Sequence, residues 1–153
     1  MTMFRWILKN QLAGGPRPRN GKQRLGQVSK SAVDTWLRQA RRLGIRSIIC
    51  FLDERELRRY QTLPVDLLSY YRANGFTVEH IPAANHQKPP LSARDLRKTW
   101  EAYNRLPKPV LIHCSAGRSR TGAAVRYIKQ RENSSADSLT PEPPLSESLN
   151  SGH

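Results

Sequence analysis

The sequence predicts an α/β fold of three layers, in which a mostly parallel central sheet is flanked by helices on both faces. Two observations predict it. Short apolar runs alternate along the chain with segments of helical periodicity, which is the pattern of strands joined by crossover helices. The last apolar run, 110–112, is followed by a tight loop and a helix-like segment at 123–130. Ligands of such sheets bind beyond the carboxyl ends of the strands, so we expect the functional site at that loop.

Apolar runs place the strands. The first two runs are followed by Gly14-Gly15, which indicates a short strand pair closed by turns. The basic segment that continues to about Gly26 indicates a surface loop. The run that ends at Leu52 is long and apolar, as in a buried strand. The predicted strands, in chain order, are 6–8, 12–13, 45–52, 76–81 and 110–112.

Helical spacing and capping residues place the helices. In the first helix, apolar residues recur at i, i+3, i+4 and i+7; Ser31 caps it and Gly44 ends it. Ser92 caps the fourth, which carries Leu96, Trp100 and Tyr103. The predicted helical segments, in chain order, are 31–43, a short polar helix at 54–60, 64–73, the segment after Ser92, and 123–130.

The length of 153 residues and a hydrophobic content of 37% suffice for one modest core, so we expect a single domain at 1–132. After Arg131 the composition turns to Asn, Ser, Pro and acidic residues without periodicity, which predicts a disordered tail at 133–153. No stretch approaches the ~20 apolar residues of a membrane span. Residues 1–8 are interrupted by Arg5 and lack a cleavage-like site, so they are not read as a signal peptide. We therefore expect a cytoplasmic protein.

The chain is strongly basic, with 26 Lys and Arg against 12 Asp and Glu and a net charge of +14. Such a charge favours anionic partners by long-range steering, but it does not choose among phosphoprotein, phospholipid and nucleic acid. The charges are spread along every segment, which fits a merely soluble basic surface equally well. Because no basic strip is interleaved with aromatic residues, no stable complex with nucleic acid is expected.

The loop between the last strand and the last helix carries the chemistry. A loop that turns its N–H groups inward at a helix N-terminus suits a tetrahedral dianion, and phosphate is the natural guest. Cys114 begins this loop beside two guanidinium groups, and such surroundings favour the thiolate. Arg120 ends it, and its planar fork can bind two phosphoryl oxygens at once. Gly117 allows a backbone conformation that a Cβ would forbid, and the Thr121 hydroxyl can stabilise the sulfur as leaving group.

The pattern His-Cys-x5-Arg-Thr, formed by His113, Cys114, Arg120 and Thr121, resembles the signature loop of the cysteine-dependent protein tyrosine and dual-specificity phosphatases. Together with segments that resemble the opening of small dual-specificity members, at 12–18 and 43–54, the resemblance covers about residues 4–131. The resemblance implies that the substrate phosphate is bound by Ser115, Ala116, Gly117, Arg118, Ser119 and Arg120.

The resemblance also implies the reaction. The Cys114 thiolate attacks phosphorus to form a cysteinyl-phosphate, which water then hydrolyses. The substrates would be phosphomonoesters in proteins: phosphotyrosine, and as a further option phosphoserine or phosphothreonine. No cofactor is implied, and no metal, because the Cys and His positions show no ligand spacing.

The general acid is the open question. In the family it is an aspartate on the loop before the signature, whereas here 82–90 contains no carboxylate and Asn85 stands in its place. Asp95 is the nearest downstream carboxylate and our candidate, although a carboxylate in the first turn of a helix also simply complements the helix dipole. The other candidates are Asp53, Glu54 and His86. Without an acid, aryl phosphates would be favoured over alkyl phosphates, and phosphotyrosine over phosphoserine.

Other residues leave alternatives open. His113 is interpreted as a buried hydrogen-bonding support for the loop. Arg118 either points to solvent or binds a second anionic group, as in family members that act on phosphoinositides or phosphatidylglycerophosphate. A phosphoinositide or phospholipid phosphatase and a weakly active phosphate-recognition module are therefore the alternative functions. Cys50 is either a core residue or a partner that forms a reversible disulfide with Cys114.

Family members usually carry further helices after the one behind the signature loop, and this sequence shows none. We therefore expect exposed apolar surface on the last helix, around Val125 and Ile128.

Overall fold

The computed structural model describes residues 3–23 and 25–139. Its five-stranded sheet has the order β1-β2-β5-β3-β4. The first two strands pair antiparallel, and the other three pairs are parallel, which confirms the predicted mostly parallel sheet. The strands are β1 (Arg5–Leu8), β2 (Leu12–Gly15), β3 (Ser47–Cys50), β4 (Thr77–His80) and β5 (Val110–His113).

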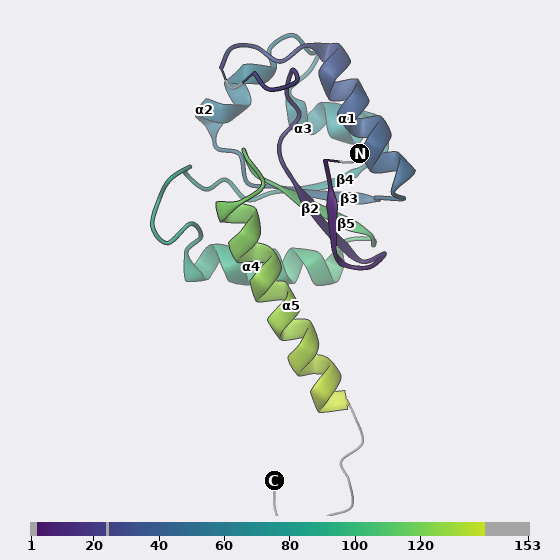
Figure 1. The fold of residues 1–153 in the computed structure, drawn as a ribbon, viewed down its shortest axis with the longest axis vertical. Coiled ribbons are helices and arrows are strands. Elements are labelled where there is room, and N and C mark those ends of the chain that lie inside the picture. Colours follow the sequence, from purple (N-terminus) through teal and green to yellow (C-terminus); the bar gives the residue numbers. More distant parts are fainter. Residues whose placement is uncertain (1–2, 24, 140–153) are drawn as a thin grey trace, which may run out of the picture.

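Helices cover both faces of the sheet and complete the three predicted layers (Figure 1). Apolar side chains of α1 and α3 share one hydrophobic cluster with one face of the sheet, and those of α4 and α5 share another with the opposite face. The helices are α1 (Lys30–Arg42), α2 (Glu54–Leu57), the 3₁₀ helix η1 (Arg58–Tyr60), α3 (Leu67–Ala73), α4 (Ala93–Arg105) and α5 (Ser119–Leu139).

The central strand β3 shows how the sequence fills both clusters. Ile48 and Cys50 face α1 and α3, whereas Ile49 and Phe51 face α4 and α5. Successive side chains of a strand point to opposite faces, so a continuous apolar run is what a strand covered on both sides needs.

Helix capping places the helix starts slightly differently from the sequence prediction. Ser29, not Ser31, caps α1, because the Ser29 hydroxyl accepts a hydrogen bond from the N–H of Ala32 at 3.1 Å. Ser92 caps α4 as predicted and accepts from the N–H of Asp95 at 3.0 Å. Both serines satisfy an N–H that the first helical turn leaves without a partner.

The last helix differs most from the prediction. It begins at Ser119, so the end of the loop is already helical, and it continues to Leu139, beyond the boundary expected at residue 132. Residues 140–153, the remainder of the predicted tail, lie outside the described residues. The expected exposure of Val125 and Ile128 is wrong. They are 5% and 0% exposed, because α5 packs against the sheet and α4 in the second cluster.

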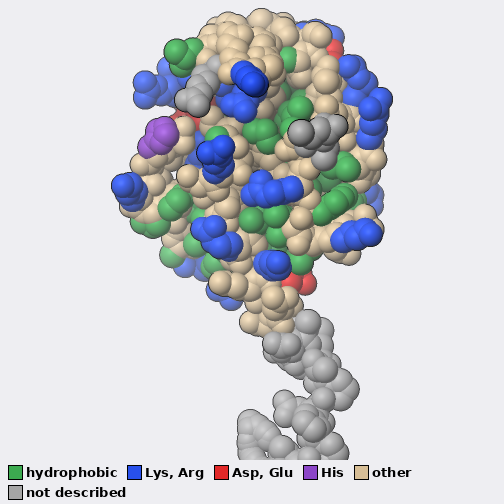
Figure 2. Space-filling model, viewed as in Figure 1, with side chains coloured by type: hydrophobic (Ala, Val, Ile, Leu, Met, Phe, Trp, Pro, Cys, Tyr) green, Lys and Arg blue, Asp and Glu red, His purple; other side chains and the backbone are tan. Residues whose placement is uncertain are grey.

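No helix in the part of the chain that the structure describes is long and apolar enough to cross a membrane. Lys and Arg side chains are spread over the face seen in Figure 2, with little acidic surface between them. This spread agrees with the scattered basic residues of the sequence.

Candidate active site

The loop from Cys114 to Arg120, here called the phosphate loop, lies between β5 and α5 as predicted. Gly117 has φ +75°, and a Cβ there would lie 2.5 Å from the carbonyl carbon of Gly15. Glycine is therefore required at this position both for its conformation and for the close approach of the two backbones. The N–H of Arg17 donates to the carbonyl of Ser115 at 3.0 Å, which ties the loop to the segment that follows β2.

A hollow of about 500 Å³ opens over the phosphate loop. It brings together most of the predicted site: Cys114, Ser115, Ala116, Arg118, Ser119, Arg120 and Asn85 line it. Arg17, Arg19, Arg59 and His86 complete the lining. Gly117 and Thr121 are buried. The volume is in the range of small-molecule sites.

Arg120 is held in place by a carboxylate that the sequence interpretation missed. Its two terminal nitrogens donate to the two carboxylate oxygens of Glu56, each at 2.8 Å. Nη1 also donates to the carbonyls of Ala83 and Phe51, at 2.7 and 3.2 Å. The Arg120 residue is 1% exposed and Glu56 8%. This paired, buried geometry fixes the plane of the guanidinium group.

The remaining edge of the Arg120 guanidinium has no protein partner. No described residue accepts a hydrogen bond from its buried Nε, and none pairs with the buried hydroxyl of Thr121. Buried polar atoms are nearly always paired in folded proteins. An unpaired donor edge on an arginine that lines the hollow therefore points to an anionic ligand.

Glu56 could have been found from its spacing. It lies in a capping box, because the Asp53 side chain accepts from the N–H of Glu56 at 2.9 Å and the N–H of Asp53 donates to Glu56 Oε1 at 3.0 Å. The box follows the carboxyl end of β3, which is adjacent to β5 in the sheet. A carboxylate fixed at that edge is well placed for an arginine of the phosphate loop.

His113 is the buried support that the sequence predicts. It is 0% exposed, its Nδ1 lies 3.1 Å from the carbonyl oxygen of Cys114, and its Nε2 lies 3.0 Å from the hydroxyl of Tyr71. A carbonyl can only accept, so Nδ1 carries the proton and Tyr71 donates to Nε2. Burial lowers the pKa of His113 to about 4, which keeps the ring neutral.

The lowered pKa of His113 predicts a pH-dependent stability. The folded state binds the neutral ring, so this contribution is complete above the ordinary pKa of 6.5 and is lost as the pH falls toward 4. We expect unfolding in urea to show a loss of about 2 kcal/mol between about pH 7.5 and about pH 5 from this group. His113→Asn should remove that part of the pH dependence. An unchanged pH dependence in the variant would contradict the assignment.

The candidate acids are divided between the hollow and other places. Asn85 and His86 line the hollow, and the Asn85 side chain accepts from the N–H of His86 at 3.1 Å. Asp95 lies in the first turn of α4, and Asp53 caps α2. Neither they nor the exposed Glu54 are among the described residues that line the hollow. The hollow itself therefore contains no described carboxylate at its surface.

The two cysteines lie on opposite faces of the sheet. Cys50 packs in the cluster with α1 and α3, and Cys114 in the cluster with α4 and α5; both are free thiols. Burial raises the pKa of Cys50 to about 12. A disulfide needs its two Cβ atoms to approach each other. Cys50 is therefore a core residue here, and the arrangement does not support the disulfide with Cys114.

No group of three or more His, Cys, Asp or Glu residues suited to a metal ion is found among residues 3–23 and 25–139.

Comparisons with known proteins follow the same direction as the geometry. A model of the tyrosine phosphatase family matches residues 23–137. No curated protein matches the chain significantly in sequence. Several solved structures have a similar fold.

Three of these structures illustrate the range. The core catalytic domain of the PP-IP phosphatase SIW14 from S. cerevisiae, in complex with citrate, has a TM-score of 0.59 and 21% identity, over 85% of this chain and 66% of that chain. PTPMT1 in complex with PI(5)P has a TM-score of 0.56 and 16% identity, over 86% and 75%. Kinase associated phosphatase with its catalytic cysteine replaced by serine has a TM-score of 0.56 and 20% identity, over 82% and 74%. The chain thus spans just under two thirds of the first, and these identities show a shared fold.

Proposed function

Because the chain belongs to the tyrosine phosphatase family and is a phosphatase, we propose that it hydrolyses phosphomonoesters through a cysteinyl-phosphate on Cys114. The observation that carries this proposal is the state of Arg120. Glu56 fixes one end of its guanidinium group while the Nε edge has no partner among the described residues. A preorganised donor edge of this kind stabilises charge that develops on a phosphoryl group in the transition state.

The reaction proceeds in two displacements. In the first, the Cys114 thiolate forms a bond to phosphorus while the bond from phosphorus to the ester oxygen breaks, and the leaving oxygen takes a proton. In the second, a water oxygen attacks phosphorus, the sulfur–phosphorus bond breaks, and inorganic phosphate and the thiolate are released. The Arg120 edge and the N–H groups of the phosphate loop bind the phosphoryl oxygens in both steps, and the Thr121 hydroxyl stabilises the departing sulfur.

The first substrate class is phosphotyrosine in proteins. An aryl oxygen leaves without much help from an acid, whereas an alkyl oxygen does not. Asn85, which lines the hollow, has no proton of the right acidity to give. This favours phosphotyrosine over phosphoserine and phosphothreonine. A reducing compartment such as the cytoplasm would keep the nucleophilic thiol free.

A second substrate class is a phosphoinositide, and one observation favours it. The exposed Arg118 lies in the phosphate loop and lines the hollow, where it can reach a second anionic group on the same substrate. One of the structures of similar fold, PTPMT1, is a complex with PI(5)P.

Replacing Asn85 by aspartate tests the proposal. We expect Asn85→Asp to raise the turnover of alkyl phosphates more than that of p-nitrophenyl phosphate, since a positioned acid contributes roughly 10² to 10⁴ in rate to a poor leaving group. Hydrolysis of both substrates is measured across pH for the wild type, Asn85→Asp and Asp95→Asn.

The matched variant decides between the acids. If Asp95→Asn removes the basic limb of the pH profile, Asp95 is the proton donor and the assignment of a site without an acid is wrong. Wild-type protein that binds a phosphate ester and turns over none would instead identify a recognition module.

A further inference from the structure

The hollow over the phosphate loop holds more positive charge than one phosphate group can neutralise. Its lining includes five arginines and no described carboxylate: Arg17, Arg19, Arg59, Arg118 and Arg120. Glu56 offsets the charge of Arg120 from below. A phosphate monoester carries at most two negative charges, which leaves several cations for other anionic groups of the same ligand.

Three of these arginines come from outside the phosphate loop. Arg17 and Arg19 follow β2, and Arg59 lies in η1. Arg17 is only 4% exposed, and its Nη1 donates to the hydroxyl of Tyr60 at 3.2 Å and to the carbonyl of Pro18 at 3.3 Å. Burial raises the pKa of Tyr60 to about 12, so its hydroxyl stays protonated and donates to Pro18 at 2.6 Å. These bonds hold the segment after β2 against η1.

The same segment is fixed to the phosphate loop. The N–H of Arg17 donates to Ser115, and the backbone of Gly117 packs against Gly15 too closely to admit a Cβ. On the other side, the N–H of Val28 donates to the carbonyl of Arg59 at 2.8 Å. The three outer arginines therefore start from backbone positions that are set relative to Cys114, unlike charges scattered on a surface.

There is room beside these arginines for more of a ligand. A second hollow of about 380 Å³ shares Arg17 and Arg19 with the first. Its other lining includes the side chains of Thr35 and Trp36. Arg17 and Arg19 thus lie between two adjacent hollows and can be reached by a ligand whose reacting phosphate is bound at Cys114.

The lining also says what kind of ligand fits. Apart from Cys114 and Ala116, every described side chain that lines the first hollow is polar or charged. A phosphotyrosine ring would need an apolar wall, whereas a compact polyphosphorylated molecule needs the donors that are present.

We propose that Arg17, Arg19 and Arg59 form a second phosphate-binding subsite, so that the substrate is a small polyphosphorylated compound with two phosphate groups close together. The subsite rests on the proposed function, because it is defined by the distance from the phosphate that Cys114 removes. Its source is either a free polyphosphorylated compound or the headgroup of a lipid.

Binding rather than turnover tests the subsite. The dissociation constants of inositol hexakisphosphate and of inorganic phosphate are measured by calorimetry for the wild type, Arg19→Ala and Arg59→Ala. Each variant should weaken inositol hexakisphosphate by about tenfold, the loss of one charge-assisted hydrogen bond, and weaken inorganic phosphate much less. Arg17→Ala is a further variant, but its burial couples binding to folding, so the other two carry the test.

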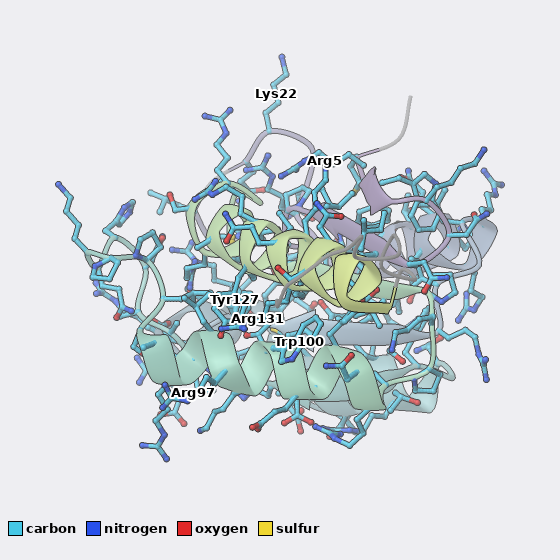
Figure 3. All side chains as sticks on the ribbon, turned by 90° about the horizontal axis from the view of Figure 1, so that it is seen from below. Arg5, Lys22, Arg97, Trp100, Tyr127 and Arg131 are labelled. Carbon is cyan, nitrogen blue, oxygen red and sulfur yellow. The ribbon has the colours of Figure 1, made fainter. Side chains whose placement is uncertain are left out.

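Arg97→Ala is the matched control. Arg97 is exposed on α4 and projects from the outer side of that helix (Figure 3), so its removal changes the net charge equally without touching the hollow. Equal weakening of both ligands, or equal effects of Arg97→Ala and the two subsite variants, would overturn the proposal and leave only general electrostatic attraction. Binding is measured without turnover, so failure of the subsite is distinguishable from failure of the phosphatase reaction.

Two further arms identify the source. Release of phosphate is compared between phosphatidylinositol bisphosphate in vesicles and its water-soluble headgroup. Faster release from either one supports the subsite and names that source. A doubly phosphorylated peptide that is hydrolysed better than both would assign the arginines to a protein substrate and overturn the proposal of a small molecule.

Discussion

Cys114→Ser protein is expected to hydrolyse p-nitrophenyl phosphate slower than wild type by a factor on the order of 10⁵. The reason is that a serine hydroxyl in this loop is neither ionised nor a good leaving group in the second step, whereas the thiolate is both a nucleophile and a leaving group. Initial rates measured at saturating substrate provide the comparison. Cys114 is 2% exposed, and serine is close to it in size, so the fold should be retained.

Two controls separate lost chemistry from lost binding. The Cys114→Ser variant should still bind inorganic phosphate, because Arg120 and the loop N–H groups are unchanged. Cys50→Ser, which removes the other thiol, should retain turnover, since Cys50 packs on the opposite face of the sheet. Substantial turnover by the Cys114→Ser variant would show that another group is the nucleophile.

Glu56→Gln is expected to lower kcat by roughly 10² to 10³, because the Arg120 fork would lose the charge that fixes its plane. It should also lower the free energy of unfolding by about 3 kcal/mol, the usual cost of leaving a buried charge without its partner. Both residues are almost fully buried, so solvent cannot take over the lost interaction. Initial rates and urea unfolding measure the two effects.

The neighbouring Glu54→Gln variant is the matched control for this change. Glu54 begins the same helix and is exposed, and it is not among the described residues that line the hollow. It should leave both rate and stability close to wild type. If Glu56→Gln kept full activity, the orientation of Arg120 would have to come from the carbonyls of Phe51 and Ala83 alone.

Local patterns in the sequence predicted most of the fold. The apolar run at Ile48 and Ile49 faces both clusters, as a strand covered by helices on each side must. The phosphate loop was also predictable, because Cys114, Gly117 and Arg120 lie on one continuous segment whose spacing alone defines the loop. Capping was less certain: Ser29 and Ser31 both precede the first helix, and only the backbone decides which hydroxyl reaches an orphan N–H.

Burial of the last helix depended on packing that its own sequence does not express. Val125 and Ile128 were expected to be exposed because no further helix follows them. The structure covers them instead with the sheet and α4, elements that precede α5 in the chain. A missing C-terminal partner thus says little about a helix face that the sheet already covers.

The residues missed at the site are those whose role depends on contacts between distant segments. Glu56 lies in a helix that reads as polar, and its partner Arg120 is 64 residues away in the chain. Arg17 and Arg59 read as parts of a scattered basic surface. They converge because β2 pairs directly with β5, which brings the segment after β2 to the phosphate loop. Strand order, which single-sequence patterns do not determine, decides which charges meet.

Mass spectrometry of wild-type protein denatured rapidly during turnover of p-nitrophenyl phosphate tests the central claim most directly. The account predicts one phosphoryl group on the peptide that carries Cys114, and none on the same peptide of the Cys114→Ser variant. Turnover with no phosphoryl group on that peptide, or with one on another residue, would contradict the cysteinyl-phosphate mechanism.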